Sequence, residues 1–267
     1  MNCSLFQNFE KNHFIEKPFP HLVIENALPN EVCERLIENY PKKKFQEMND
    51  FKLSNKRLDL MYKETRKGPG PAIWNDTETP TIWKDFLKQN TSDEFKLKFK
   101  EIFKEKFIEI YNNSFPEIEN IYTNIAVSAN SPVQENYNSV RKAHLDQPTK
   151  LFTGLYYLRD ENDNTKGGDL EILTWKKNIK TDLDKSHHAR NTEINNNKVD
   201  LIKTIKYKKN TFVIFLNTIE SLHGVTEREK TSNIRKFCVL TGTLQTRLYD
   251  KGISKKNQIK RIIQKFF

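Results

Sequence analysis

Three residues in the second half of the 267-residue sequence are candidates for holding one metal ion. His144 and Asp146 are two positions apart in the segment KAHLDQP, and His223 follows in SLHGVT. In an extended segment, residues two positions apart lie on one face, so this imidazole and this carboxylate can share one ion. By itself, an HxD triplet is more often a surface or capping feature. A third ligand is needed to favour the metal interpretation.

His223 is a candidate for that third ligand. It follows the apolar run NTFVIFLN and precedes a glycine, which predicts a position at a strand end near a turn. In an antiparallel double-sheet barrel, strands far apart in sequence can be neighbours in space. Two histidines and one carboxylate leave three coordination positions open, a ligand set typical of non-haem Fe(II) oxygenases. A closed structural zinc site would need a fourth ligand, and none is evident.

Arg235 lies twelve residues after His223, in the apolar run IRKFCVLTG, on a strand that we expect beside the strand of His223. Its planar guanidinium could bind a dicarboxylate through two parallel hydrogen bonds, which Lys cannot do. A simple surface arginine is the alternative, since Lys236 next to it shows that basic residues are common here. The residue alone leaves both interpretations open.

The elements that must position these side chains are strands. After Pro116 the sequence shows short β-like runs: IYTNIAVSA, KLFTGLYYL, GDLEIL, DLIKTIKY, NTFVIFL and RKFCVLTGTL. Before them, residues 18–28 predict a strand, Pro29 opens a helix to about Tyr40, and apolar residues at helical spacing predict a helix from Thr91 to Tyr111. We therefore expect an α+β protein with a mainly β core, an antiparallel jelly roll with an N-terminal helical layer.

Three segments lack a clear pattern. Residues 42–79 are polar and predict an ordered loop packed by Leu58, Leu60 and Trp74, and residues 176–199 predict an insertion loop. That second loop holds His187 and His188, but adjacent histidines point in different directions, which argues against ligation. The C-terminal NQIKRIIQKFF predicts a basic amphipathic helix, which either docks on its own domain or touches a membrane or partner.

Length and composition favour one domain over 1–267, with a helical support region at 1–120, a β core at 121–245 and a C-terminal helix at 246–267. The formal charge of +10 is spread over the chain, so we expect no specific nucleic-acid partner. Three cysteines without CxxC spacing, no signal peptide and no apolar span predict a cytoplasmic protein. Oligomeric state does not follow from the sequence.

Taken together, the HxD, the distal histidine and the following arginine resemble the 2-oxoglutarate and Fe(II)-dependent oxygenase superfamily, in its prolyl 4-hydroxylase-like branch of bacterial or phage type. The resemblance covers most of residues 18–245, including PFPHLVIENALP, KAHLDQPTKLFTGLYYL, GGDLEIL and FLNTIESLHGV. It implies a cupin-like double-stranded β-helix, with iron at His144, Asp146 and His223 and the distal carboxylate of 2-oxoglutarate on Arg235. Many prolyl hydroxylases have Lys at the Arg235 position, so this chain follows the arginine pattern seen elsewhere in the superfamily.

The resemblance also implies secondary co-substrate contacts on the strand after the HxD, where Thr153, Tyr156 and Tyr157 are candidates, with Thr153 and Tyr157 on one face. Arg141 is a candidate substrate contact, although pairing with a carboxylate is the simpler role.

The implied activity is hydroxylation of an unactivated C–H bond in a small metabolite or a peptidyl proline. Fe(II), 2-oxoglutarate and O2 are the implied cofactors, succinate and CO2 are released, and ascorbate is a candidate reductant for reactivation. Retention of Asp146 favours hydroxylation over halogenation. Two rival functions use the same residues differently. One is a cupin-like metal hydrolase or isomerase, and the other is a jelly-roll binding module without catalysis.

Overall fold

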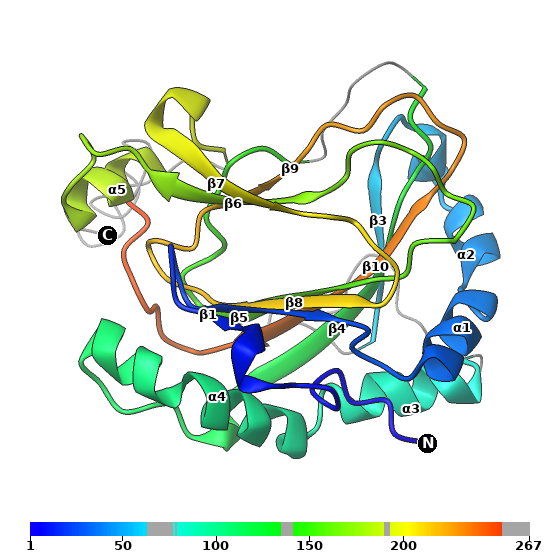
Figure 1. The fold of residues 1–267 in the computed structure, drawn as a ribbon, viewed down its shortest axis with the longest axis horizontal. Coiled ribbons are helices and arrows are strands. Elements are labelled where there is room, and N and C mark those ends of the chain that lie inside the picture. Colours follow the sequence, from blue (N-terminus) through cyan, green and yellow to red (C-terminus); the bar gives the residue numbers. More distant parts are fainter. Residues whose placement is uncertain (63–76, 78, 135–140, 190–192, 253–267) are drawn as a thin grey trace, which may run out of the picture.

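Two antiparallel β-sheets face each other in the computed structural model, which describes residues 1–62, 77, 79–134, 141–189 and 193–252 (Figure 1). The larger sheet has the strand order β1-β2-β8-β5-β10-β4-β3, and the smaller has the order β7-β6-β9. The strands are β1 (Phe14–Ile15), β2 (His21–Glu25), β3 (Arg57–Met61), β4 (Tyr122–Asn130), β5 (Lys150–Tyr157), β6 (Leu170–Trp175), β7 (Val199–Ile205), β8 (Thr211–Leu216), β9 (His223–Val225) and β10 (Arg235–Thr243).

From β4 onward, the chain passes back and forth between the two sheets. β4, β5, β8 and β10 belong to the larger sheet, whereas β6, β7 and β9 belong to the smaller. The segment around His144 extends the smaller sheet, because His144 forms a β-bridge with His223 of β9. This alternation between facing sheets is the jelly-roll arrangement. The predicted double-stranded β-helix is confirmed.

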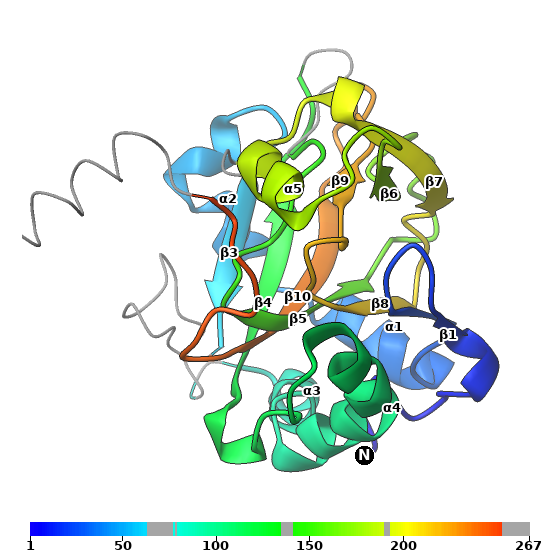
Figure 2. The same ribbon diagram turned by 90° about the vertical axis from the view of Figure 1, so that its left-hand side faces the viewer.

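The helices are α1 (Asn30–Glu38), α2 (Lys42–Gln46), α3 (Thr81–Gln89), α4 (Asp93–Tyr111) and α5 (Asp182–Ala189). In two perpendicular views, α3 and α4 lie below the larger sheet, on the side away from the smaller sheet (Figures 1 and 2). The side chain of Ser92 caps the N-terminus of α4 by accepting from the N–H of Phe95 at 3.3 Å. Asn112 ends the helix in the left-handed conformation.

Aromatic side chains join α4 to the larger sheet. The ring of Phe99 lies 4.5 Å from the rings of both Phe103 and Phe152. Phe152 and Tyr156 point from β5 into the same apolar cluster as α4. Tyr157 belongs instead to a cluster between the two sheets, against which Leu155 packs. The period of two in β5 therefore divides its side chains between the helical layer and the space where the predicted site lies.

The predicted loop over 42–79 was wrong in part, because the segment contains α2 and the strand β3. Leu58 and Leu60 are buried, as expected, while Arg57, Asp59 and Met61 occupy the opposite face of the strand. β3 pairs with β4 at the edge of the larger sheet, a tertiary contact that a polar five-residue run does not reveal. Trp74 lies outside the described residues.

Three further differences concern boundaries. The N-terminal 120 residues supply β1, β2 and β3 to the larger sheet as well as helices. The helix α3 and, within the predicted 176–199 loop, α5 were not expected. Residues 246–252 are not helical, and the rest of the predicted C-terminal helix lies outside the described residues. Within the described part of the chain, no helix combines the length and apolar character needed to span a membrane.

Candidate active site

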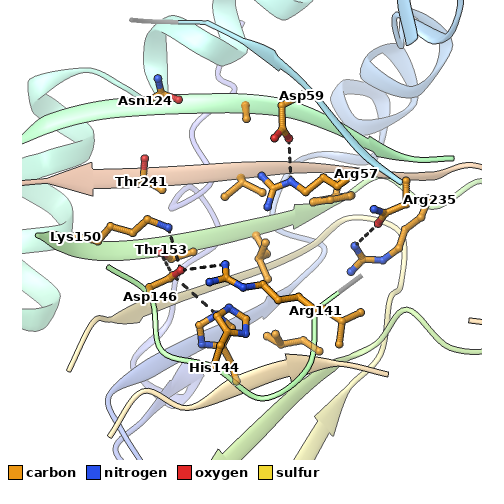
Figure 3. Close-up of a pocket in the computed structure, with 18 of the residues that line it drawn as sticks. Arg57, Asp59, Asn124, Arg141, His144, Asp146, Lys150, Thr153, Arg235 and Thr241 are labelled. Atoms are coloured by element: carbon orange, nitrogen blue, oxygen red, sulfur yellow. Dashed lines mark hydrogen bonds and ion pairs between the residues drawn. The ribbon is translucent and has the colours of Figure 1, made fainter. Parts of the chain in front are cut away.

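A cavity of about 230 Å³ opens between the two sheets (Figure 3). Strands β3, β4, β5 and β10 line it from the larger sheet, and the His144 segment, β6 and β9 line it from the smaller sheet. All three predicted metal ligands line this cavity, and so do Arg235 and Thr153. Residues from distant parts of the sequence therefore meet in one place, as the predicted barrel requires.

The two histidines face each other across the β-bridge. The N–H of His144 donates to the carbonyl of His223 at 2.9 Å, and the N–H of His223 donates back at 3.2 Å. Their imidazole rings lie 4.1 Å apart, centre to centre. Nε2 of His223 is 3.9 Å from Oδ2 of Asp146. One ligand atom from each of the three residues lies within 4.8 Å of the others, the one such group found in the described part of the chain.

The period of two in the extended HxD segment explains how both ligands reach the cavity. Ala143 and Leu145 pack into a separate apolar cluster with Trp175 and Leu222. Because neighbouring side chains in an extended segment point to opposite faces, His144 and Asp146 are turned toward the cavity. His144 lies in the bridge and Asp146 just beyond it, so the segment is extended as predicted but forms no regular strand.

Backbone carbonyls orient both imidazoles. Nδ1 of His144 lies 2.7 Å from the carbonyl oxygen of Lys142, and Nδ1 of His223 lies 2.9 Å from that of Ser221. A carbonyl only accepts, so each Nδ1 carries the proton and each Nε2 keeps a lone pair for a metal. Burial lowers the pKa of both histidines. Both rings are therefore neutral, the form that a metal ion needs.

Asp146 is buried, and three neighbours contact its carboxylate. The hydroxyl of Thr153 donates to Oδ2 at 2.7 Å, and Nζ of Lys150 donates to Oδ1 at 3.1 Å. Arg141 Nη1 lies 3.7 Å from the same Oδ1, which is the pairing expected as its simpler role. Although burial raises the pKa of Asp146, the charge of Lys150 and the hydrogen bond from Thr153 hold it well below the ordinary value. The carboxylate is therefore ionised.

Arg235 opens strand β10 and is buried between the sheets. Its Nε donates to the carbonyl of Gly168 at 2.9 Å, and Nη1 donates to Oδ1 of Asn130 at 3.3 Å. Its guanidinium also lies over the rings of Tyr157, Tyr207 and Phe237, at 4.5 to 5.3 Å. Among the described residues, no carboxylate lies within ion-pair distance of this guanidinium. Since β10 pairs with β4 and β5, the expected placement of Arg235 beside the strand of His223 was wrong.

Gly168 has a role that the sequence did not show. Its φ is +77°, and a Cβ there would lie 3.0 Å from Cδ and Nε of Arg235. A larger residue would therefore push against the arginine as well as strain the backbone. Gly168 therefore makes room for Arg235.

Two buried donors beside Arg235 lack a hydrogen-bond partner among the described residues: Nδ2 of Asn130 and the hydroxyl of Tyr157. Burial raises the pKa of Tyr157 to about 12, so its hydroxyl stays protonated. An unpaired buried donor costs about 1–3 kcal/mol. Asn130 and Arg235 line the cavity, whereas Tyr157 is not among its lining residues. A carboxylate at this end of the cavity would accept from Asn130 and Arg235, so the residues present fit the distal carboxylate of 2-oxoglutarate. Tyr156 faces the helical layer and is not part of the site.

Several residues of the site were missed by reasoning from sequence. Arg57 and Asp59 reach the cavity from β3, and Lys150 lines it beside Asp146. Asn217 is buried and donates to the carbonyls of Gln147 and Lys150, which ties the HxD loop to the end of β8. One sequence pattern could have indicated a further wall of the site. Asn124, Ala126 and Asn130 lie on one face of β4 by their even spacing, and all three line the cavity.

A double-stranded β-helix that buries two histidines, one aspartate and one arginine in a single cavity has the architecture of a non-haem iron oxygenase. Residues 134–241 match the family model described as the 2OG-Fe(II) oxygenase superfamily, and this stretch contains all four residues. This match and the buried site together indicate an Fe(II)- and 2-oxoglutarate-dependent dioxygenase. A comparison with curated proteins found no match.

Solved structures similar to this chain include prolyl 4-hydroxylases. One from Pseudomonas putida is 13% identical, with 85% of this chain and 93% of that chain covered and a TM-score of 0.47. One from Phytophthora capsici is 14% identical, with 91% and 66% covered and a TM-score of 0.49. A Trichoplax adhaerens prolyl hydroxylase, in complex with a hypoxia inducible factor peptide fragment, is 10% identical, with 84% of each chain covered and a TM-score of 0.42.

Proposed function

We propose that His144, Asp146 and His223 of this dioxygenase hold Fe(II), that Arg235 binds 2-oxoglutarate, and that the enzyme hydroxylates an unactivated C–H bond of a small molecule or peptide. One observation carries this proposal. Three ligand atoms within 4.8 Å of one another share a cavity with a buried arginine that pairs with no carboxylate among the described residues. The products expected from the co-substrate are succinate and CO2.

Each residue of the chain has a distinct part in this proposal. The two imidazoles and the Asp146 carboxylate would hold Fe(II), and Thr153 fixes the carboxylate through its hydroxyl. Arg235 and Asn130 orient 2-oxoglutarate by its distal carboxylate. Bound Fe(II) supplies the reaction with O2 that couples oxidation of the co-substrate to that of the substrate. Ascorbate, as a reductant that restores Fe(II), belongs to the same proposal.

The experiment is a measurement of succinate formed from 2-oxoglutarate by the purified protein with Fe(II) and O2, with and without candidate substrates. We expect slow succinate formation without substrate, and none when Fe(II) is omitted or when Asp146 is replaced by Asn. A protein that turns over substrates with bound metal but without 2-oxoglutarate would instead be a hydrolase or isomerase. A folded protein that binds no metal would be a binding module.

A further inference from the structure

Besides Arg235, three cationic side chains line the cavity: Arg57, Arg141 and Lys150. The carboxylates that line it are Asp59 and Asp146. Figure 3 shows Arg57 on β3 and Arg141 on the opposite side of the cavity, with the carboxylate of Asp146 beside Arg141. Positive charge is therefore gathered in the cavity that holds the ligand cluster.

Arg57 is held in place by the strand and by Asp59. Residues 57, 59 and 61 share the face of β3 that lines the cavity. Nε of Arg57 donates to Oδ1 of Asp59 at 2.9 Å, and the hydroxyl of Ser128 donates to the same oxygen at 2.5 Å. The guanidinium also lies 5.7 Å from the centre of the Phe237 ring. Because Asp59 accepts the hydrogen bond from Nε of Arg57, the two terminal nitrogens of the guanidinium can donate two parallel hydrogen bonds to a ligand.

Arg141 and Lys150 both contact Asp146, a proposed metal ligand. Nη1 of Arg141 lies 3.7 Å from Oδ1 of Asp146, and Nζ of Lys150 lies 3.1 Å from the same oxygen. In the proposed complex, Fe(II), Asp146, 2-oxoglutarate and Arg235 together carry no net charge. Arg57 is balanced by Asp59. The charges of Arg141 and Lys150 are then left without a counterion among the cavity residues, which leaves an excess of two positive charges in the cavity.

Arg57 and Arg141 also influence each other directly. Both guanidinium groups line the same cavity. Two guanidinium groups that face one cavity repel each other, and an anion between them would replace that repulsion with two attractions. The cavity holds about 230 Å³, which suits a small molecule better than a folded segment.

Resting on the proposed function, we propose that the substrate is a small acid, and that Arg57 and Arg141 bind its carboxylate or phosphate group between them, Arg57 from β3 and Arg141 from the side of the metal ligands. Arg57 is then a specificity-determining residue. A forked guanidinium distinguishes an acid from its amide or ester, because only the charged group offers two equivalent acceptor oxygens with a full negative charge.

The test uses the full chain loaded with Fe(II) and 2-oxoglutarate without oxygen, so that binding is measured apart from turnover. The ligands are pairs that differ only in charge: amino and hydroxy acids against their amides, sugar phosphates against the free sugars, and acetate and methylphosphonate as minimal probes. Binding is followed by ligand-observed NMR and by titration calorimetry. The variants are Arg57→Gln and, as a charge-matched control, Arg35→Gln, which changes an arginine on α1, outside the cavity.

We expect acids to bind in preference to their neutral partners, with the phosphate and carboxylate pairs showing which acid is preferred. Arg57→Gln should weaken that binding by about tenfold to a hundredfold, while Arg35→Gln should leave it unchanged. Binding of 2-oxoglutarate itself should be the same in all three proteins, which separates this proposal from the proposed function. Preferred binding of neutral partners, no binding of any acid to the loaded protein, or an unchanged dissociation constant in Arg57→Gln would overturn it.

Discussion

At the scale of single residues, Arg235 is the side chain whose role is most sharply defined by its surroundings. It is held by Gly168 and Asn130 and stacked on aromatic rings, so its free donors are fixed in direction. We predict that Arg235→Lys weakens 2-oxoglutarate binding by about tenfold to a hundredfold, because a lysine keeps the charge and loses the fork. Equilibrium titration with 2-oxoglutarate measures this, with exposed Arg247→Lys as control. Equal affinity in both variants would contradict the assignment.

Thr153 offers a second test at this scale, because its hydroxyl donates to the carboxylate of Asp146 at 2.7 Å. Thr153→Val keeps the shape and removes the donor. We predict about tenfold to a hundredfold weaker Fe(II) binding, the usual effect of losing a hydrogen bond that orients a metal ligand. Thr241→Val makes the same change at another threonine of the cavity and should have little effect. If both variants bind metal like the parent protein, Thr153 does not orient Asp146.

The grouping of the three proposed ligands could be predicted from sequence because their residue types are specific and two of them are two positions apart. Thr153 and Tyr157 were correctly placed on one face of their strand, but sequence could not say which face looked inward. The pairing of Arg141 and Lys150 with Asp146 could not be foreseen in full, since it depends on how a loop folds back on β5. Arg57 was missed altogether, because the run RLDLM carries too much charge to be recognised as a strand.

At the scale of elements, the contact between β5 and β10 beneath the helical layer leaves no room for an added side chain. A Cβ at Gly242 would lie 2.2 Å from the ring of Phe152. We predict that Gly242→Ala lowers the free energy of unfolding by about 1–3 kcal/mol through overpacking. Denaturant unfolding measures it. Adding Phe152→Leu should make the Gly242→Ala step less costly, whereas an undiminished cost in the presence of Phe152→Leu would place the strain elsewhere.

The six predicted strands after Pro116 and the helix ending at Tyr111 are all present, because each carries its own period of apolar residues. Two missed strands lack that signal: β9 has three residues, and β3 owes its place to β4, a partner distant in sequence. The missed helix α3 does carry it, because Ile82, Trp83, Phe86 and Leu87 have the spacing of one helical face and are buried. Local sequence patterns thus predicted the strands of the barrel, whereas the edge strand β3 depends on its pairing with β4.

At the scale of the whole molecule, buried His21 should make stability depend on pH. Its Nδ1 lies 2.8 Å from the carbonyl of Phe19, and Nε2 lacks a partner among the described residues. Burial lowers its pKa, so the unfolded chain binds a proton at a pH where folded His21 does not. Stability should therefore fall as pH drops below about 6.5, by up to about 1.4 kcal/mol per pH unit for this residue.

Comparing urea unfolding of the parent protein and His21→Phe between pH 8 and pH 5 tests this. The variant should lose less stability on acidification, whereas His187→Asn, at an exposed histidine of α5, should follow the parent curve. Parallel curves for all three proteins would mean that His21 does not contribute. The other buried histidines, His144 and His223, add to the slope of all three curves equally.

The central claim is that His144, Asp146 and His223 hold Fe(II) so that 2-oxoglutarate chelates it while Arg235 holds the far carboxylate. The most direct test is the visible metal-to-ligand charge-transfer band of the anaerobic protein with Fe(II) and 2-oxoglutarate, which needs no knowledge of the substrate. We predict the band in the parent protein, its loss in His144→Ala, and a higher 2-oxoglutarate concentration for its half-saturation in Arg235→Ala. A folded, iron-loaded protein without the band, or with the same band in all three proteins, would contradict this assignment.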